Sequence, residues 1–147
     1  LPVLGKLEMT MSVARLTRSL STLLGGGTTL LDALQTSREA MRNRLYAMHL
    51  NQVMQKVAEG TTLAVALQQT GIIPPTALKM VQVGESSGAL DKMLAEVAQY
   101  YEDAMEDSLD TIATLIEPLL MLLMGIIVGG VIIVMYLPIF NLANVIR

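Results

Sequence analysis

The longest apolar run in the chain, Pro118 to Phe140, limits what the chain can fold into more than any other feature. It holds 23 residues without a formal charge, and a helix of that length rises about 35 Å. Because the hydrocarbon core of a bilayer is about 30 Å thick, the run predicts a transmembrane helix; the core helix of a soluble protein is the alternative. Tyr136 suits the far headgroup layer, and Pro138 is expected to end the helix there.

Two glycines within this run, Gly125 and Gly129, form a GxxxG pair, with Gly130 beside it. A helix face without side chains lets a second helix backbone approach closely. Specific helix packing and merely tolerated glycine are both open. The orientation of the span is also open, because Arg147 is the only basic residue after the run and favours an inside C-terminus only weakly.

The polar part of the chain, up to Glu117, reads as helix throughout. Its apolar residues recur at intervals of three and four, and no stretch alternates with a period of two. The expected helices cover roughly residues 8–24, 30–37, 41–58, 62–70 and 75–84, and a last helix from 89 into the apolar run. The sequence therefore predicts an all-α fold: a six-helix bundle whose last long helix continues into a C-terminal transmembrane helix.

Helix-start signals support these boundaries. Thr28 or Thr29 is expected to cap the second helix, in the manner of a capping box with Asp32, and Thr61 or Thr62 the fourth. Proline is favoured at the first position of a helix, so Pro75 opens the fifth. The octet pattern G-T-T-L-x-x-A-L occurs from Gly27 and again from Gly60, which indicates a doubled helical hairpin.

Apolar stripes predict which faces are buried. The third helix is expected to turn Leu45, Met48, Val53 and Val57 inward. The stripe of the last helix keeps helical spacing up to the membrane run: Leu90, Met93, Leu94, Val97, Tyr101, Met105, Leu109, Ile112 and Ile116. No glycine or proline interrupts it between Ala89 and Glu117. The last soluble helix and the span are therefore expected to form one rod.

Two carboxylates stand out. Glu85 lies in "GESSG", Gly84 to Gly88, which reads as a turn; it either decorates the surface, caps the following helix or reaches a neighbouring helix end. Glu117 precedes Pro118 at the start of the apolar run. It lies either in the headgroup layer or against other helices, because ionisable groups near hydrocarbon usually face protein or water. Pro118 is expected to bend the rod.

Composition excludes several classes of function. The net charge of −3, the pI near 5.0 and the few aromatic residues argue against nucleic-acid binding. The chain has no cysteine, and His49 has no neighbour at metal-ligand spacing. The acidic residues between Glu102 and Asp110 lack the loop and glycine of a calcium motif, so they read as a solvated face. Since no catalytic motif is present, we expect no enzyme, no metal and no cofactor.

Taken together, the motifs resemble the inner-membrane platform proteins of type II secretion systems and type IV pilus machines, the GspF/PilC family. The resemblance covers nearly the whole chain: "LPVLGKL", "ARLTRSLSTLLGGGTTLLDAL", "VGESSGALDKML", "YYEDAMEDSL", "LIEPLL" and "YLPIF". The matching family positions are Gly84, Glu85, Gly88, Glu117, Pro118 and Pro138.

This resemblance implies that the chain is a fragment of a longer protein. Residues 1–111 would be the second copy of a duplicated helical domain in the cytoplasm, and residues 112–147 the last transmembrane helix with a short periplasmic tail. Arg147 departs from what the charge rule prefers there. The resemblance places the protein in the bacterial inner membrane. The rival readings are a tail-anchored helical regulatory or interaction protein and a membrane enzyme.

The implied function is a non-enzymatic platform that couples a hexameric assembly or secretion ATPase to the addition of pilin or pseudopilin subunits. Its expected partners are that ATPase, the pilins or pseudopilins, other inner-membrane components of the machine, membrane lipid and further copies of the chain. The stiff junction between bundle and span suits mechanical coupling, since a flexible linker would absorb the motion.

Overall fold

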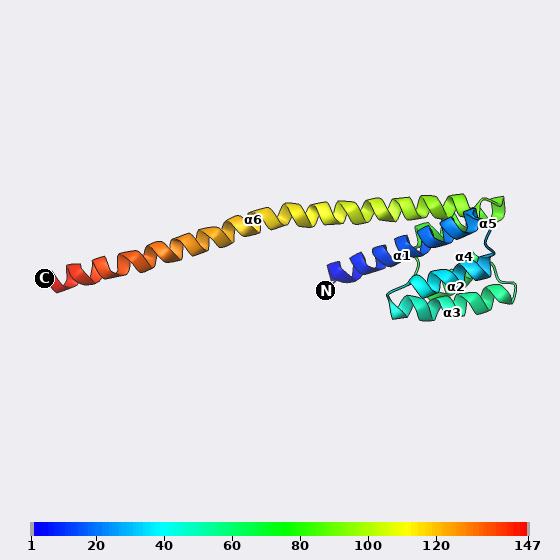
Figure 1. The fold of residues 1–147 in the computed structure, drawn as a ribbon, viewed down its shortest axis with the longest axis horizontal. Helices are drawn as coiled ribbons and strands as arrows, with labels where there is room; N and C mark the ends of the chain where they lie inside the picture. Colours follow the sequence, from blue (N-terminus) through cyan, green and yellow to red (C-terminus); the bar gives the residue numbers. More distant parts are fainter. Residues whose placement is uncertain (1, 147) are drawn as a thin grey trace. The chain divides into compact units, whose positions relative to one another are not determined.

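A computed structural model describes the backbone of residues 2–146 and the side chains of residues 4–146. Six helices follow one another in this part of the chain, and it contains no strand (Figure 1). They are α1 (Pro2–Gly25), α2 (Leu30–Ala40), α3 (Arg44–Ala58), α4 (Leu63–Thr70), α5 (Pro75–Ser87) and α6 (Leu90–Ile146). The chain divides into two compact units, one ending at Glu106 and one beginning at Asp107. The predicted all-α class is confirmed.

The predicted helix starts are confirmed at three places. The Thr29 side chain accepts a hydrogen bond from the Asp32 backbone N–H at 3.3 Å, and that of Thr62 accepts one from the Val65 N–H at 3.4 Å. Pro75 occupies the first turn of α5. The two threonine hydroxyls each satisfy an N–H donor that has no partner inside its helix. The first helix, however, begins at Pro2 rather than near Glu8.

The core of the first unit is built from the apolar stripes of all six helices. From α1, Val13, Leu16 and Leu20 lie in this core. The buried hydroxyl of Ser37 donates to the half-buried hydroxyl of Ser19 at 2.9 Å. The largest fully buried apolar side chains are Leu16, Leu20, Leu34, Leu50, Leu63 and Leu94.

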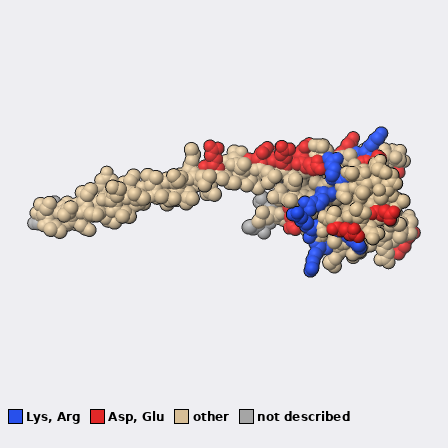
Figure 2. Space-filling view, in the orientation of Figure 1, with Lys and Arg blue, Asp and Glu red and all other residues tan. Residues whose placement is uncertain are grey.

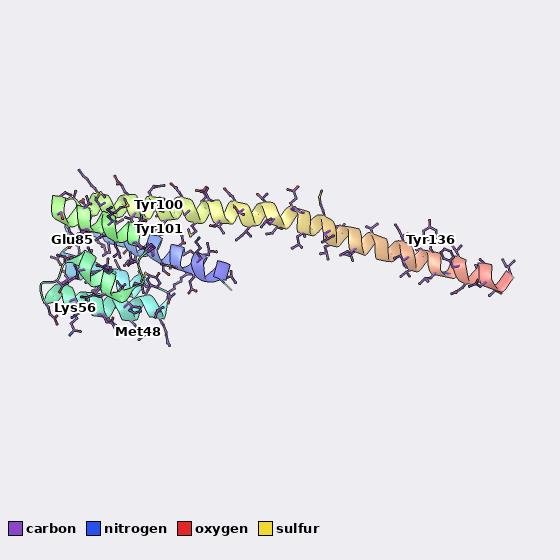
Figure 3. The ribbon with its side chains drawn as sticks, turned by 180° about the vertical axis from the view of Figure 1, so that it is seen from behind. Met48, Lys56, Glu85, Tyr100, Tyr101 and Tyr136 are labelled. Carbon is purple, nitrogen blue, oxygen red and sulfur yellow. The ribbon has the colours of Figure 1, made fainter. Side chains whose placement is uncertain are left out.

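The predicted inward face of α3 is wrong in its first half. Leu45 and Met48 are 54% and 64% exposed, and Figure 3 shows Met48 at the outer side of the bundle. Tyr46 and Leu50 are buried instead. The Tyr46 hydroxyl donates to the carbonyl of Ile72 at 3.0 Å, which gives its buried polar end a partner.

The "GESSG" segment is not a turn. Residues 84–87 are the last turn of α5, and only Gly88 leaves the helix, at φ 72°. Gly88 and Ala89 are the two residues between Ser87 and α6, which begins at Leu90. A glycine such as Gly84 often indicates a turn, but glycine is needed at this position because α5 packs closely against α6.

The last helix, α6, is uninterrupted from Leu90 to Ile146, so the predicted continuity of the soluble helix and the apolar run is confirmed. The expectation that Pro138 ends the helix is wrong, because both Pro118 and Pro138 lie inside α6. In the described part of the chain α6 alone is long and apolar enough to cross a membrane, with a mean hydropathy of 2.7 in its most apolar window.

Candidate functional site

The end of α5 and the start of α6 approach closely at Gly84. A Cβ atom at this buried position would lie 2.9 Å from the Cβ of Met93 and 3.0 Å from the Cα of Leu90. The first distance is shorter than real Cβ contacts allow, and the second is tighter than most and involves backbone that cannot rotate away. Gly84 therefore sets how closely the two helices pack.

The carboxylate of Glu85 reaches the N-terminus of a neighbouring helix, α4. One oxygen accepts from the Leu63 N–H at 2.7 Å and the other from the Ala64 N–H at 2.8 Å. These N–H groups have no partner within α4, and the positive end of the helix dipole favours a negative charge there. Thr62, the residue just before α4, caps the same helix end. Glu85 thus ties α5 to α4 (Figure 3).

The motif closes at Gly88, whose left-handed backbone ends α5. The next residue, Ala89, donates its N–H to the carbonyl of Gly84 at 3.0 Å. The chain therefore reverses within two residues and returns along α5 as α6. Gly84, Glu85 and Gly88 form one junction of three helices, α4, α5 and α6, which we call the α4–α6 junction.

A second set of contacts joins α1 to the first turns of α6. The guanidinium of Arg18 donates to both carboxylate oxygens of Glu102, each at 2.9 Å. Near the start of α6, the Ser21 hydroxyl donates to the backbone carbonyl of Asp91 at 3.0 Å. The Arg18 hydrogen bonds lower the pKa of Glu102, and those to Glu102 raise the pKa of Arg18. Both side chains are about 40% exposed, 42% and 36%, so solvent weakens the pair.

Glu117 and Pro118 lie inside α6, in the second unit. Pro118 has no N–H to give to the carbonyl of Thr114, so the helix lacks one bond at this point. Glu117 is exposed and shares a shallow groove of this helix with Ala113 and Leu120. Whether this carboxylate faces headgroups or other helices stays a prediction, and so does the bend at Pro118.

The GxxxG glycines, Gly125 and Gly129, have open space beside them. A Cβ atom at either position would meet no atom within 4 Å. Specific helix packing at this face stays a prediction. Pro138 and Tyr136 lie further along the same helix.

Chemistry for catalysis does not assemble among the described residues. No group of three or more metal-ligating side chains gathers in residues 2–146. His49 is partly buried on α3, and its Nδ1 has no hydrogen-bond partner there. The expected absence of enzyme activity, metal and cofactor remains an expectation. The Arg18–Glu102 pair was not anticipated, because 84 positions separate its members and no local pattern marks them.

A family model described as "Type II secretion system (T2SS), protein F" matches residues 16–138. The type IV pilus assembly protein PilC of Pseudomonas aeruginosa is 40% identical over 99% of this chain and 39% of its own length. PilC of Myxococcus xanthus is 39% identical over 100% of this chain and 35% of its own length. The type II secretion system protein F of Pseudomonas aeruginosa is 34% identical over 96% and 35% respectively.

The chain thus spans well under half the length of the curated relatives it matches. The match itself extends from the middle of α1 to Pro138 in α6 and includes the α4–α6 junction, the Arg18–Glu102 pair and most of the apolar run. The chain belongs to the type II secretion system protein F family, which also includes the PilC proteins of type IV pilus assembly.

Proposed function

We propose that this chain is the C-terminal part of a non-enzymatic inner-membrane platform protein, which couples a cytoplasmic hexameric ATPase to the assembly of pilin or pseudopilin subunits. The observation that carries the proposal is the continuity of α6, in a chain of this family. One uninterrupted helix, α6, carries residues near its start that are buried in the bundle, such as Leu94 and Val97, and also the apolar run long enough to cross a bilayer.

The contacts at the start of α6 support mechanical coupling. Gly84 lets α5 pack closely on α6, Ser21 holds the backbone at Asp91, and Arg18 holds Glu102. A helix fixed to a bundle at several heights resists sliding and rotation against it. Force on the bundle is therefore passed to α6, whereas a flexible linker would absorb it.

The remaining parts of the proposal follow the family. The first 111 residues are the second copy of a duplicated domain in the cytoplasm, and residues 112–147 carry the last span and end in the periplasm. Partners are the ATPase, the pilins or pseudopilins, other inner-membrane components, lipid and further copies of the chain. Gly84, Glu85, Gly88, Glu117, Pro118 and Pro138 serve the architecture of the platform.

The coupling is tested by softening α6 just before the apolar run. We replace Thr111, Ile112 and Ala113 by glycine in the full-length gene, at a cost of roughly 0.5–1 kcal/mol of helix stability per residue relative to alanine. The matched control carries Thr111→Ala and Ile112→Ala, which remove the same side chains and keep the helix. Assembled surface pili and secreted proteins are both measured, since either machine is a candidate.

The expected result is that the glycine variant loses output and the alanine control keeps most of it. Limited proteolysis must show an intact bundle in both variants. Unchanged output from the glycine variant refutes coupling through a stiff α6. Equal loss in both variants assigns the effect to the side chains of Thr111 and Ile112 instead.

A further inference from the structure

Three arginines gather at one end of the bundle, where α1 passes the connection between α2 and α3. Arg15 lies on α1, Arg42 in the connection and Arg44 at the first position of α3. Arg15 and Arg42 line a common cleft of about 210 Å³, together with Met11 and with Glu8, whose carboxylate accepts a hydrogen bond from Asn43 at 3.0 Å. Figure 2 shows blue side chains gathered over this part of the molecule. We call Arg15, Arg42 and Arg44 the basic surface.

The basic surface has no partner of its own. All three arginines are exposed, and no hydrogen bond or ion pair engages any of them within residues 4–146. Apolar side chains lie beside them in the sequence and on the surface: Met11, Leu45 and Met48 are 43%, 54% and 64% exposed. Unpaired guanidinium groups next to exposed apolar groups are typical of a protein interface rather than of a solvated face.

A matching negative surface runs along α6. Glu96, Gln99, Asp103 and Glu106 are all exposed. Successive members are three or four residues apart, so they share one side of the helix. We call these four residues the acidic stripe; Figure 2 shows the acidic residues of α6 in red.

The acidic stripe lies on the outer side of α6. Leu94 and Val97, on its inner side, are fully buried in the bundle. The one ion pair within the described residues joins Arg18 to Glu102, and neither belongs to the two surfaces. Each chain therefore presents a positive surface and a negative surface that no ion pair neutralises, on different elements; within the negative surface Asp103 accepts a hydrogen bond only from the neutral side chain of Gln99, at 2.9 Å.

We propose that the basic surface of one copy of this chain binds the acidic stripe on α6 of a second copy. The contact joins two different surfaces, so it either repeats around a ring or occurs twice across a two-fold axis. The proposal rests on the platform role in one respect only: several copies anchored by α6 in one bilayer meet at high effective concentration, which favours individually weak ion pairs.

An anionic lipid surface is a less suitable occupant of the basic surface. The residues of α6 that immediately precede the apolar run include Asp107, Asp110 and Glu117. An anionic headgroup layer would repel these carboxylates, which directly precede the span. A second copy satisfies both charge signs at once.

The test uses disulfide formation between two differently tagged copies of the full-length protein in native membranes. The described chain contains no cysteine, so a single pair is introduced: Ala40→Cys beside the basic surface in one copy and Gln99→Cys in the acidic stripe of the other. The proposal expects a mixed disulfide dimer. The matched control pair, Lys56→Cys with Gln99→Cys, places the first thiol at the far end of α3 and is expected to give none.

Charge exchange makes the test specific. Arg42→Glu with Arg44→Glu in the first copy should reduce the mixed dimer at least about tenfold, because attraction becomes repulsion. Adding Glu96→Lys with Asp103→Lys to the second copy should restore it. Reversal of Lys56 and Lys79, which lie outside the basic surface, should leave the yield unchanged. Raising the salt concentration should weaken the wild-type contact.

Several outcomes overturn the proposal. These are an unchanged dimer yield in the Arg42→Glu, Arg44→Glu variant, and a lost yield that the exchanged acidic stripe fails to restore. A third is loss of binding to phosphatidylglycerol vesicles in the same variant while its dimer yield is unchanged, which assigns the basic surface to lipid. Because the readout is dimer formation, its failure is distinguishable from a failure of pilus assembly or secretion.

Discussion

Replacing Gly84 by alanine should destabilise the bundle, although alanine favours helix more than glycine does. Inside a helix the exchange gains roughly 0.5–1 kcal/mol from backbone entropy. Against this gain stands the new methyl group, 2.9 Å from the Cβ of Met93 and 3.0 Å from the Cα of Leu90. Overpacking of this kind costs about 1–3 kcal/mol. Since the Leu90 contact is with backbone, we expect the upper half of that range and a net loss of about 1–2 kcal/mol.

The measurement is the free energy of unfolding of the bundle in detergent micelles, followed by circular dichroism in denaturant. Gly5→Ala is the matched control, because Gly5 also lies within a helix but a Cβ there meets no atom within 4 Å. The control should gain stability by about 0.5–1 kcal/mol. If Gly84→Ala gains as much as Gly5→Ala, the close approach of α5 and α6 does not exist in solution and the reasoning is refuted.

Three further predictions concern polar contacts. Glu85→Ala should lower the free energy of unfolding by about 2 kcal/mol, because the Leu63 and Ala64 N–H groups lose charge-assisted hydrogen bonds. Glu85→Gln should cost about half of that. Chemical denaturation in micelles measures both variants. Burial raises the pKa of Tyr46 to about 12, so stability should be full below the ordinary pKa near 10 and fall by roughly 2–3 kcal/mol as the pH approaches 12. Tyr46→Phe should remove that alkaline fall while lowering stability at pH 8, and an unchanged pH profile would contradict it. Arg18 lowers the pKa of Glu102, so the pair stabilises above the ordinary carboxyl pKa and its contribution disappears as the pH falls below it. Because both groups are well exposed, Glu102→Gln should cost under about 1 kcal/mol at pH 7 and progressively less as the pH falls through the lowered pKa of Glu102.

The helix order and most helix starts could be predicted from the sequence because their signals are local. The caps at Thr29 and Thr62 and the proline at position 75 act on groups within a few residues of themselves. The continuity of α6 could be predicted for a similar reason, since nothing between Ala89 and Glu117 interrupts helical spacing. The apolar run could be predicted from its length and its apolar composition together.

The errors arise where distant residues decide. On α3, Leu45 and Met48 lie on one face of the helix, and Tyr46 and Leu50 lie on the adjacent face. Both faces are apolar, and only the packing of the other helices decides that the face with Tyr46 and Leu50 is buried. A glycine at position 84 reads locally as a turn, but its role depends on Met93 and Leu90 across the helix pair. Proline at position 138 ends no helix, because a helix tolerates one missing bond when its other backbone groups remain paired.

The α4–α6 junction and the α1 contacts together define what the first unit contributes to coupling. They act on the first turns of α6 at three heights: near Leu90 through Gly84, at Asp91 through Ser21, and at Glu102 through Arg18. Two of these contacts involve fixed backbone and the third a pair of flexible side chains. Loss of the Arg18–Glu102 pair should therefore loosen α6 without releasing it, whereas an added methyl group at Gly84 displaces the helix where it begins. If α6 transmits force, pilus or secretion output should be more sensitive to Gly84→Ala than to Glu102→Gln, and the reverse order would place the decisive contact at α1.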